Sequence, residues 1–207
     1  MFDLRRGTLR DRLAEAVSLE HPHLYRPNFA GRPAGVLLLF GLTGESPGRS
    51  ADIDDLRILV TRRTERMTTH KSQYALPGGT KDPEDLSIEA TALRETQEEM
   101  GVAPEHVETL GILPELWTPS GFRITPVVGL LRRPVEEIEI VPNADEIDHW
   151  FWCGIREMRD PAIYTREKRE IRHEERNYSV DVDVFQIDEH RIWGATLTTT
   201  ATVTNRD

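Results

Sequence analysis

Three glutamates near the middle of the chain, Glu95, Glu98 and Glu99, constrain this sequence more than any other feature. A helical pattern covers residues 86–100, and at about 100° per residue the spacing i, i+3, i+4 places the three carboxylates on one side of that helix. Apolar side chains fall on the opposite side: Leu86, Ala90 and Leu93. The pattern therefore predicts a helix that buries one face and presents a cluster of carboxylates on the other.

Such a cluster has two interpretations. Like charges at this spacing repel and raise one another's pKa unless a cation lies among them, and oxygen-rich clusters suit Mg²⁺ or Mn²⁺. A bare acidic stripe is also typical of a solvated helix face. The flanking residues favour the metal site, because the helix follows the turn Pro77-Gly78-Gly79, where glycine permits close approach of the backbone, and it ends at Gly101.

The rest of the chain indicates a mixed α/β class, because helical patterns alternate with strand patterns. Apolar or alternating stretches typical of strands cover residues 35–40, 56–61, 73–76, 107–113, 122–131, 149–152 and 178–187. A further helical pattern covers 8–18, and the run 166–176, which mixes charges of both signs, is expected to form an exposed helix. We expect an N-terminal helix and linker over 1–31, followed by one main domain over 32–207.

Composition excludes several classes of function. A formal net charge of -10 argues against a general nucleic-acid binder, since such proteins carry a basic surface for the phosphates. No apolar run approaches the roughly 20 residues that span a bilayer, so no membrane association is predicted. The first twelve residues lack the pattern of a secretory signal, and the lone Cys153 fits a reducing compartment. The expected location is the cytoplasm.

The segment Gly79–Val102 resembles the Nudix box, the signature of the Nudix hydrolases. Its second half is present as Arg-Glu-Thr-Gln-Glu-Glu-Met-Gly-Val over residues 94–102, with Thr96 standing where an aliphatic residue is usual. In the first half, Asp85 replaces a glutamate, and eight residues instead of seven separate it from Arg94. That insertion is common in the coenzyme A pyrophosphatase branch of the family.

Residues upstream of the box also resemble that branch, whose motif reads Leu-Leu-Thr, one residue, Arg-Ser, a later Arg and Gly, and then Phe-Pro-Gly-Gly. The matching residues are Leu59, Val60, Thr61, Arg63, Thr64, Leu76, Pro77, Gly78 and Gly79. Two positions depart from the motif, because Thr68 stands for the later Arg and Ser72 for the Gly. The tail over residues 190–196 is similar to the C-terminal segment of the branch.

The resemblance implies a Nudix-type α/β/α sandwich around a mixed sheet and metal-dependent hydrolysis of a phosphoanhydride bond in a nucleoside diphosphate derivative. It favours coenzyme A or acyl-coenzyme A, cut to 3′-phospho-ADP and (acyl-)phosphopantetheine. The departures at Thr68 and Ser72 keep open an alternative, a pyrophosphatase for ADP-ribose or another nucleoside diphosphate sugar. A catalytically silent nucleotide-binding regulator is a third reading. The resemblance is compatible with a homodimer.

The resemblance also implies roles for single residues. The metal ligands are Glu95, Glu98, Glu99 and the Gly79 carbonyl, and the bound ion is Mg²⁺ or Mn²⁺. Arg94 pairs with Asp85 as a structural brace, with direct phosphate contact as the alternative. Glu146 is the choice for general base, although a solvated acidic loop explains it equally. The basic stretch before the turn offers Arg63, Arg66 and Lys71 for substrate phosphates, or forms a solvated face.

Overall fold

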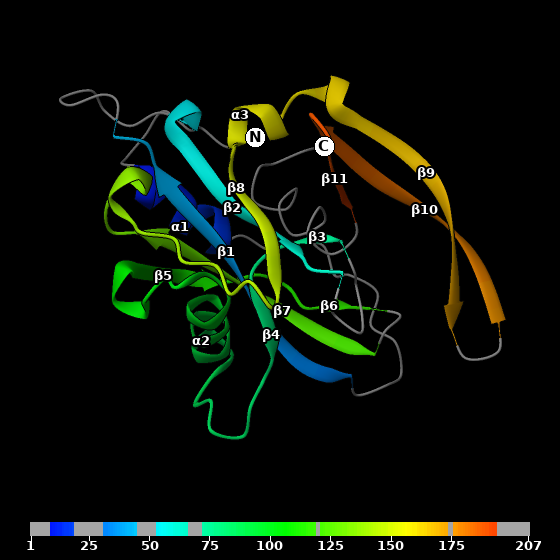
Figure 1. The fold of residues 1–207 in the computed structure, drawn as a ribbon, viewed down its shortest axis with the longest axis horizontal. Helices are drawn as coiled ribbons and strands as arrows, with labels where there is room; N and C mark the ends of the chain where they lie inside the picture. Colours follow the sequence, from blue (N-terminus) through cyan, green and yellow to red (C-terminus); the bar gives the residue numbers. More distant parts are fainter. Residues whose placement is uncertain are drawn as a thin grey trace.

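In the computed structural model, the described residues are 9–18, 31–44, 53–65, 72–118, 121–173 and 176–193. Strands dominate this part of the chain (Figure 1). The α-helices are α1 (Leu9–Ser18), α2 (Ile88–Met100) and α3 (Ile155–Met158). The strands are β1 (Arg32–Leu42), β2 (Leu56–Arg63), β3 (Tyr74–Ala75), β4 (Gly78–Thr80), β5 (Val107–Ile112), β6 (Leu116–Trp117), β7 (Phe122–Leu131), β8 (Ile147–Gly154), β9 (Tyr164–His173), β10 (Arg176–Ile187) and β11 (His190–Trp193).

The main sheet is mixed, as predicted. Its path runs β3-β2-β1-β7-β5, and β4, β6 and β8 pair with β1, β7 and β2 respectively. The central pair β1 and β7 is parallel, whereas the other pairs are antiparallel. β1 pairs with β2 through residues 40–42 and with β4 through residues 34–36, so β4 extends the same edge of β1. This arrangement places the glycine turn directly beside the central strand.

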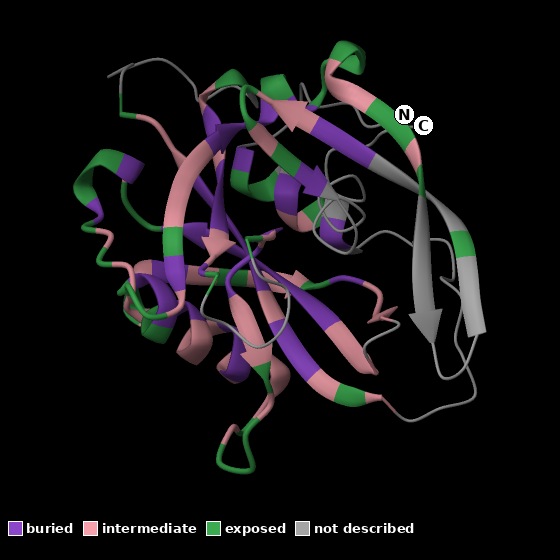
Figure 2. Ribbon diagram, turned by 45° about the vertical axis from the view of Figure 1, so that its right-hand side comes forward, coloured by how far each residue is buried: buried purple, intermediate pink, exposed green. Residues whose placement is uncertain are grey.

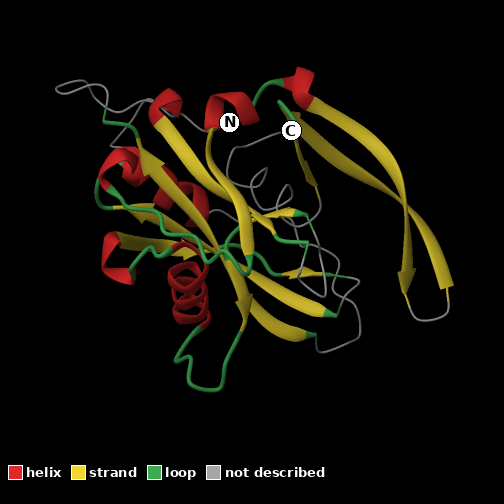
Figure 3. Ribbon diagram, in the orientation of Figure 1, coloured by secondary structure: helices red, strands yellow, loops and turns green. Residues whose placement is uncertain are grey.

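Two cores cover the two faces of the sheet, because side chains alternate along β1. Leu38 and Phe40 contribute to a core that also buries α1 through Leu9 and Leu13. The alternate residues of the strand, Leu37 and Leu39, contribute to the core that lies under α2. Helices thus lie on both faces of a mixed sheet, as the α/β/α expectation requires (Figure 3). Figure 2 shows many of the buried residues along the strands. The domain boundary at residues 31 and 32 stays a prediction.

The segment after Pro161 corrects one expectation. The sequence predicts an exposed helix over residues 166–176, but β9 pairs with β10 along its whole length in a long antiparallel hairpin that projects from the body (Figure 1). The register sets Lys168 opposite Asp181 and Arg166 opposite Asp183. Pairing with a distant segment overrides the helical composition here. The strand expected over 178–187 is confirmed within β10.

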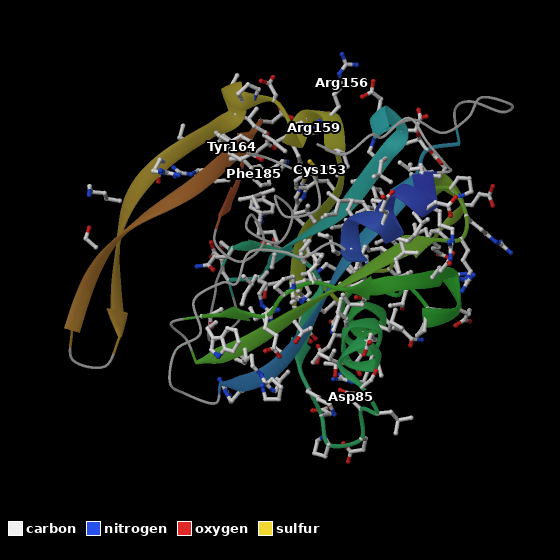
Figure 4. The ribbon with its side chains drawn as sticks, turned by 180° about the vertical axis from the view of Figure 1, so that it is seen from behind. Asp85, Cys153, Arg156, Arg159, Tyr164 and Phe185 are labelled. Carbon is white, nitrogen blue, oxygen red and sulfur yellow. The ribbon has the colours of Figure 1, made fainter. Side chains whose placement is uncertain are left out.

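The hairpin is anchored at its root. The rings of Tyr164 and Phe185 pack 5.7 Å apart, and the Tyr164 hydroxyl donates to the Met158 carbonyl at 2.7 Å (Figure 4). Cys153 is buried in the same core as Phe185, where burial raises the pKa of its thiol to about 12. Cys153 is therefore a packed, unreactive thiol. No helix in the described ranges is long and apolar enough to cross a membrane.

Candidate active site

Helix α2 is fixed at both ends by caps. The Ser87 hydroxyl accepts from the Ala90 N–H at 3.2 Å, and Gly101 adopts a left-handed conformation with φ 73° while its N–H donates to the Gln97 carbonyl. The glutamate helix thus begins at residue 88, two residues later than predicted. Leu86 corrects the expectation of a buried ridge, because it lies in the loop before the helix and its side chain is 98% exposed.

The helix lies very close to the central strand. A Cβ built on Gly35 would come within 2.7 Å of the Ile88 carbonyl, so only glycine fits at this position of β1. Thr96, where the Nudix box usually has an aliphatic residue, is buried on this side of the helix, and its hydroxyl donates to the Ala92 carbonyl at 2.7 Å. That hydrogen bond satisfies the buried hydroxyl, which explains how threonine is tolerated.

The glycine turn accommodates two of the glutamates. A Cβ built on Gly79 would lie 2.4 Å from the Glu95 carboxylate, so a side chain here would displace it. The Gly78 N–H donates to Glu99 Oε2 at 3.1 Å. The predicted turn and helix therefore meet as expected, with the carboxylates of Glu95 and Glu99 directed at the backbone of β4.

Burial makes two of these carboxylates unusually costly to ionise. Glu99 is 2% exposed, and burial raises its pKa to about 7 against the opposing effects of Arg63 and the Gly78 N–H. Burial also raises the pKa of Glu95, and the charges of Glu98 and Glu146 add to that effect. Negative charge is thus concentrated in a poorly solvated place, where a cation would be stabilised.

Arg94 braces the loop before the helix. Its Nε and Nη2 each lie 3.0 Å from an oxygen of Asp85, and Nη2 also donates to the Thr80 carbonyl at 3.2 Å. The same guanidinium reaches Glu95 at 3.0 Å and Glu98 at 2.9 Å. Figure 4 shows Asp85 in the loop that leads into α2. The geometry is that of the brace that the resemblance implies.

Arg63 joins the helix to a second loop. It lies at the end of β2, and its Nη1 donates to Glu99 Oε1 at 3.0 Å. Its Nη2 lies 3.7 Å from Glu146 Oε2. The structure thus brings together the helix glutamates, Arg63 and Glu146. Arg66 and Lys71 lie outside the described residues.

Residues that the sequence analysis gave no site role fix the position of Glu146. The Thr64 N–H donates to the Glu146 carbonyl at 2.8 Å, and the Thr64 hydroxyl donates to the Asp145 carbonyl at 3.0 Å. From the other side, the Asn143 N–H donates to the Glu99 carbonyl at 2.8 Å. The turn before β8 is therefore held to both β2 and α2. Of these residues, Thr64 was the one with a signal in the sequence, because it matches the motif of the coenzyme A branch. That match assigned it no role.

Among the described residues, no three histidine, cysteine, aspartate or glutamate side chains are arranged so that they could hold a metal ion as they stand. The glutamates pair with arginines instead: Arg94 binds Glu95 and Glu98, and Arg63 binds Glu99. The donor chemistry nevertheless fits a divalent cation. Four carboxylates influence one another, and glycine leaves room for one of them at the backbone of β4.

Comparison with known proteins adds the following. The NUDIX domain family matches residues 50–174. An uncharacterized Nudix hydrolase, NudL, from Pectobacterium atrosepticum is 37% identical over 139 residues, which cover 67% of this chain and 69% of that protein. The protein of the same description from Escherichia coli O7:K1 is 29% identical over 192 residues, covering 93% and 85% respectively. A crystal structure of a Nudix hydrolase from M. smegmatis, RenU, has a TM-score of 0.47 at 22% identity, covering 62% of this chain and 74% of that one.

Proposed function

Since this chain belongs to the Nudix hydrolase family, we propose that it hydrolyses the phosphoanhydride bond of coenzyme A or acyl-coenzyme A, giving 3′-phospho-ADP and (acyl-)phosphopantetheine. The observation that carries the hydrolytic part is the group of carboxylates from α2 and the turn before β8, gathered beside the glycine turn. The branch motif around Arg63 and Thr64 supports the choice of substrate. The relatives carry no assigned substrate in their descriptions.

Members of the family generally require divalent metal ions. We assign Mg²⁺ or Mn²⁺ to Glu95, Glu98, Glu99 and the Gly79 carbonyl, because these residues supply the hard oxygen donors that such ions prefer. The ion neutralises phosphate charge and makes bound water more acidic. Arg94 holds the loop and helix together through Asp85. We assign Arg63, which lies beside Glu99, to a phosphate of the substrate.

We assign the general base to Glu146. Its carboxylate is only partly buried, lies beside Arg63, and is placed by backbone hydrogen bonds to Thr64 and Asn143 that are independent of its side chain. A base needs a fixed position and access to water, and this location provides both.

Replacing Glu146 with Gln is expected to lower kcat by about ten- to a hundredfold, because the amide cannot accept the proton from the attacking water. Turnover of the preferred diphosphate is the measurement. Asp145→Asn is the matched control, since it makes the same charge change one residue earlier on an exposed side chain. Equal turnover in the Glu146 variant and the parent would remove Glu146 from the reaction.

A substrate panel tests the proposal itself. Coenzyme A, an acyl-coenzyme A, ADP-ribose and NADH are incubated with the enzyme and Mg²⁺ or Mn²⁺, and the products are identified by mass. We expect 3′-phospho-ADP from coenzyme A at the highest kcat/KM. If ADP-ribose or NADH is consumed while coenzyme A stays intact, the alternative substrate class holds. The departures at Thr68 and Ser72 are the specific observation in favour of that alternative.

A silent regulator is the remaining reading. It would be supported by tight nucleotide binding without turnover of any member of the panel. We do not favour it, because Glu95, Glu98 and Glu99 are all present and such regulators typically lose glutamates of the box.

A further inference from the structure

Arg63 acts as the counter-ion of two carboxylates that belong to different elements. Its guanidinium extends from the end of β2 to Glu99 on α2 and to Glu146 in the turn before β8. These are the carboxylates assigned above to metal binding and to the general base. The positive charge beside both carboxylates is therefore supplied by a side chain of the protein, Arg63.

Both carboxylate oxygens of Glu99 already accept a hydrogen bond. Its Oε2 accepts from the Gly78 N–H at 3.1 Å, and its Oε1 accepts from Arg63 at 3.0 Å. The side chain is almost completely buried, so water cannot readily take the place of either donor. A divalent cation that binds Glu99 through Oε1 would compete with the guanidinium for that oxygen. The two positive charges also repel one another at such short range.

We propose that Arg63 is a built-in counter-ion of the metal site. A divalent cation displaces Arg63 from Glu99, and the released guanidinium then binds a phosphate of the substrate. The inference rests on the metal site of the proposed function and adds an order of binding, in which the metal ion comes before the substrate phosphate. Metal binding creates the anion-binding group, because a guanidinium already paired with carboxylates is a poor phosphate ligand. A released one offers the bidentate geometry that suits phosphate oxygens.

Arg94 provides the contrast within the same site. It holds Asp85 through two hydrogen bonds and the Thr80 carbonyl through a third, so it can lose Glu95 and Glu98 to a metal ion and still keep its place. Within the described part of the chain, the side chain of Arg63 contacts only carboxylates in this way, those of Glu99 and Glu146, and it has no comparable anchor. The two arginines therefore differ in role: Arg94 stays, and Arg63 moves.

The neighbouring residue supplies a matched control. Arg62 has the same charge and lies on the same strand, but its side chain projects from the opposite face of β2. Its Nε donates to Asp148 at 2.7 Å, and its guanidinium lies 5.9 Å from the centre of the Tyr74 ring. Loss of a positive charge at this position tests the general electrostatic effect without touching Glu99.

The experiment measures binding of Mn²⁺ alone by calorimetry to the parent, Arg63→Gln and Arg62→Gln. We expect Arg63→Gln to bind Mn²⁺ about tenfold more tightly, since a charge-assisted competitor has been removed. Its KM for the diphosphate substrate should rise in the same preparation. Arg62→Gln should bind Mn²⁺ within about twofold of the parent, as an exposed charge is largely screened.

If the role of Arg63 is only structural, its replacement should change the affinity for Mn²⁺ in the opposite direction. If Arg63 only holds Glu99 in place, its replacement weakens Mn²⁺ binding, and that result overturns the inference. Equal tightening in the Arg62 variant also overturns it, because the effect would then be general electrostatics. If the parent binds Mn²⁺ and hydrolyses its substrate while Arg63→Gln binds the ion no more tightly, only this inference fails. If the parent binds no Mn²⁺, the metal site of the proposed function fails as well.

A second measurement does not depend on whether the Arg63→Gln variant folds. The parent is labelled with ¹⁵N-arginine and titrated with Mg²⁺, which is diamagnetic, while the guanidinium resonances are followed. The Arg63 signal, identified by its absence in Arg63→Lys, should shift in step with metal occupancy, and the Arg62 signal should not. An Arg63 signal that stays fixed while Mg²⁺ binds would contradict the displacement.

Discussion

Glu98→Gln is expected to lower kcat by about a thousandfold or more and to leave the fold intact. The Glu98 side chain is 56% exposed and forms an i, i+4 ion pair with Arg94. Such an exposed pair contributes only about 0.3–0.5 kcal/mol to stability. The carboxylate is nonetheless one of the assigned metal ligands, and removal of its charge weakens the stabilisation of negative charge that develops during phosphoryl transfer.

The measurement is kcat with saturating Mg²⁺ and substrate, together with the thermal midpoint of each protein. Glu89→Gln is the matched control, because it removes the same charge from the first turn of the same helix. It should keep parental turnover. A Glu98 variant as active as the parent would contradict the metal-centred account, whereas a variant that loses activity and also unfolds would contradict the minor structural role.

The glutamate helix and its C-terminal end were predictable because their signals are local. The spacing of Glu95, Glu98 and Glu99 fixes one face of any helix that contains them, and Gly101 marks the end of that helix. The pairing of Arg94 with Asp85 came from the family resemblance. The start of the helix was wrong by two residues, because Ser87 caps it and the exposed Leu86 belongs to the loop.

The hairpin of β9 and β10 could not be predicted from local composition. Residues 165–175 are rich in charged residues, which are equally compatible with an exposed helix and with an exposed strand. The decision depends on the register with residues 176–185, which is a tertiary property. Strands with a continuous apolar run, such as β1, left no such ambiguity because they are buried on both faces.

The assembly of the site was only partly predictable. Its helix glutamates follow from spacing, but the approach of Glu146 depends on hydrogen bonds from Thr64 and Asn143, residues about 80 positions apart in the chain. The Arg63–Glu99 pair likewise joins the end of a strand to the end of a helix. No periodicity in the sequence encodes such contacts, because they arise from how β2, α2 and β8 pack together.

Asp85→Asn is expected to lower the free energy of unfolding by about 2–3 kcal/mol at pH 7, which corresponds to a thermal midpoint lower by roughly 5–10 °C. Asp85 is only 7% exposed, receives two hydrogen bonds from Arg94 and one from the Thr91 hydroxyl at 2.9 Å, and accepts from the Asp82 N–H. The variant leaves Arg94 without its main counter-ion. Asp82→Asn is the control, since the Asp82 carboxylate also approaches Arg94, at 3.6 Å, but is 58% exposed and should contribute less than about 1 kcal/mol.

The pH dependence gives an independent check on the Asp85 brace. The hydrogen bonds from Arg94 are the largest cause that holds the pKa of Asp85 well below its usual value, against the opposing effect of burial. A carboxylate whose pKa is lowered in the folded state contributes its full stabilisation above the unfolded pKa of about 3.9 and loses it as the pH falls towards the folded pKa. The difference in unfolding free energy between the parent and Asp85→Asn should thus stay constant from pH 7 to about pH 5 and shrink below about pH 4. Urea denaturation at each pH measures it, and a difference that persists unchanged at pH 3 would show that the stabilisation does not come from the ionised pair.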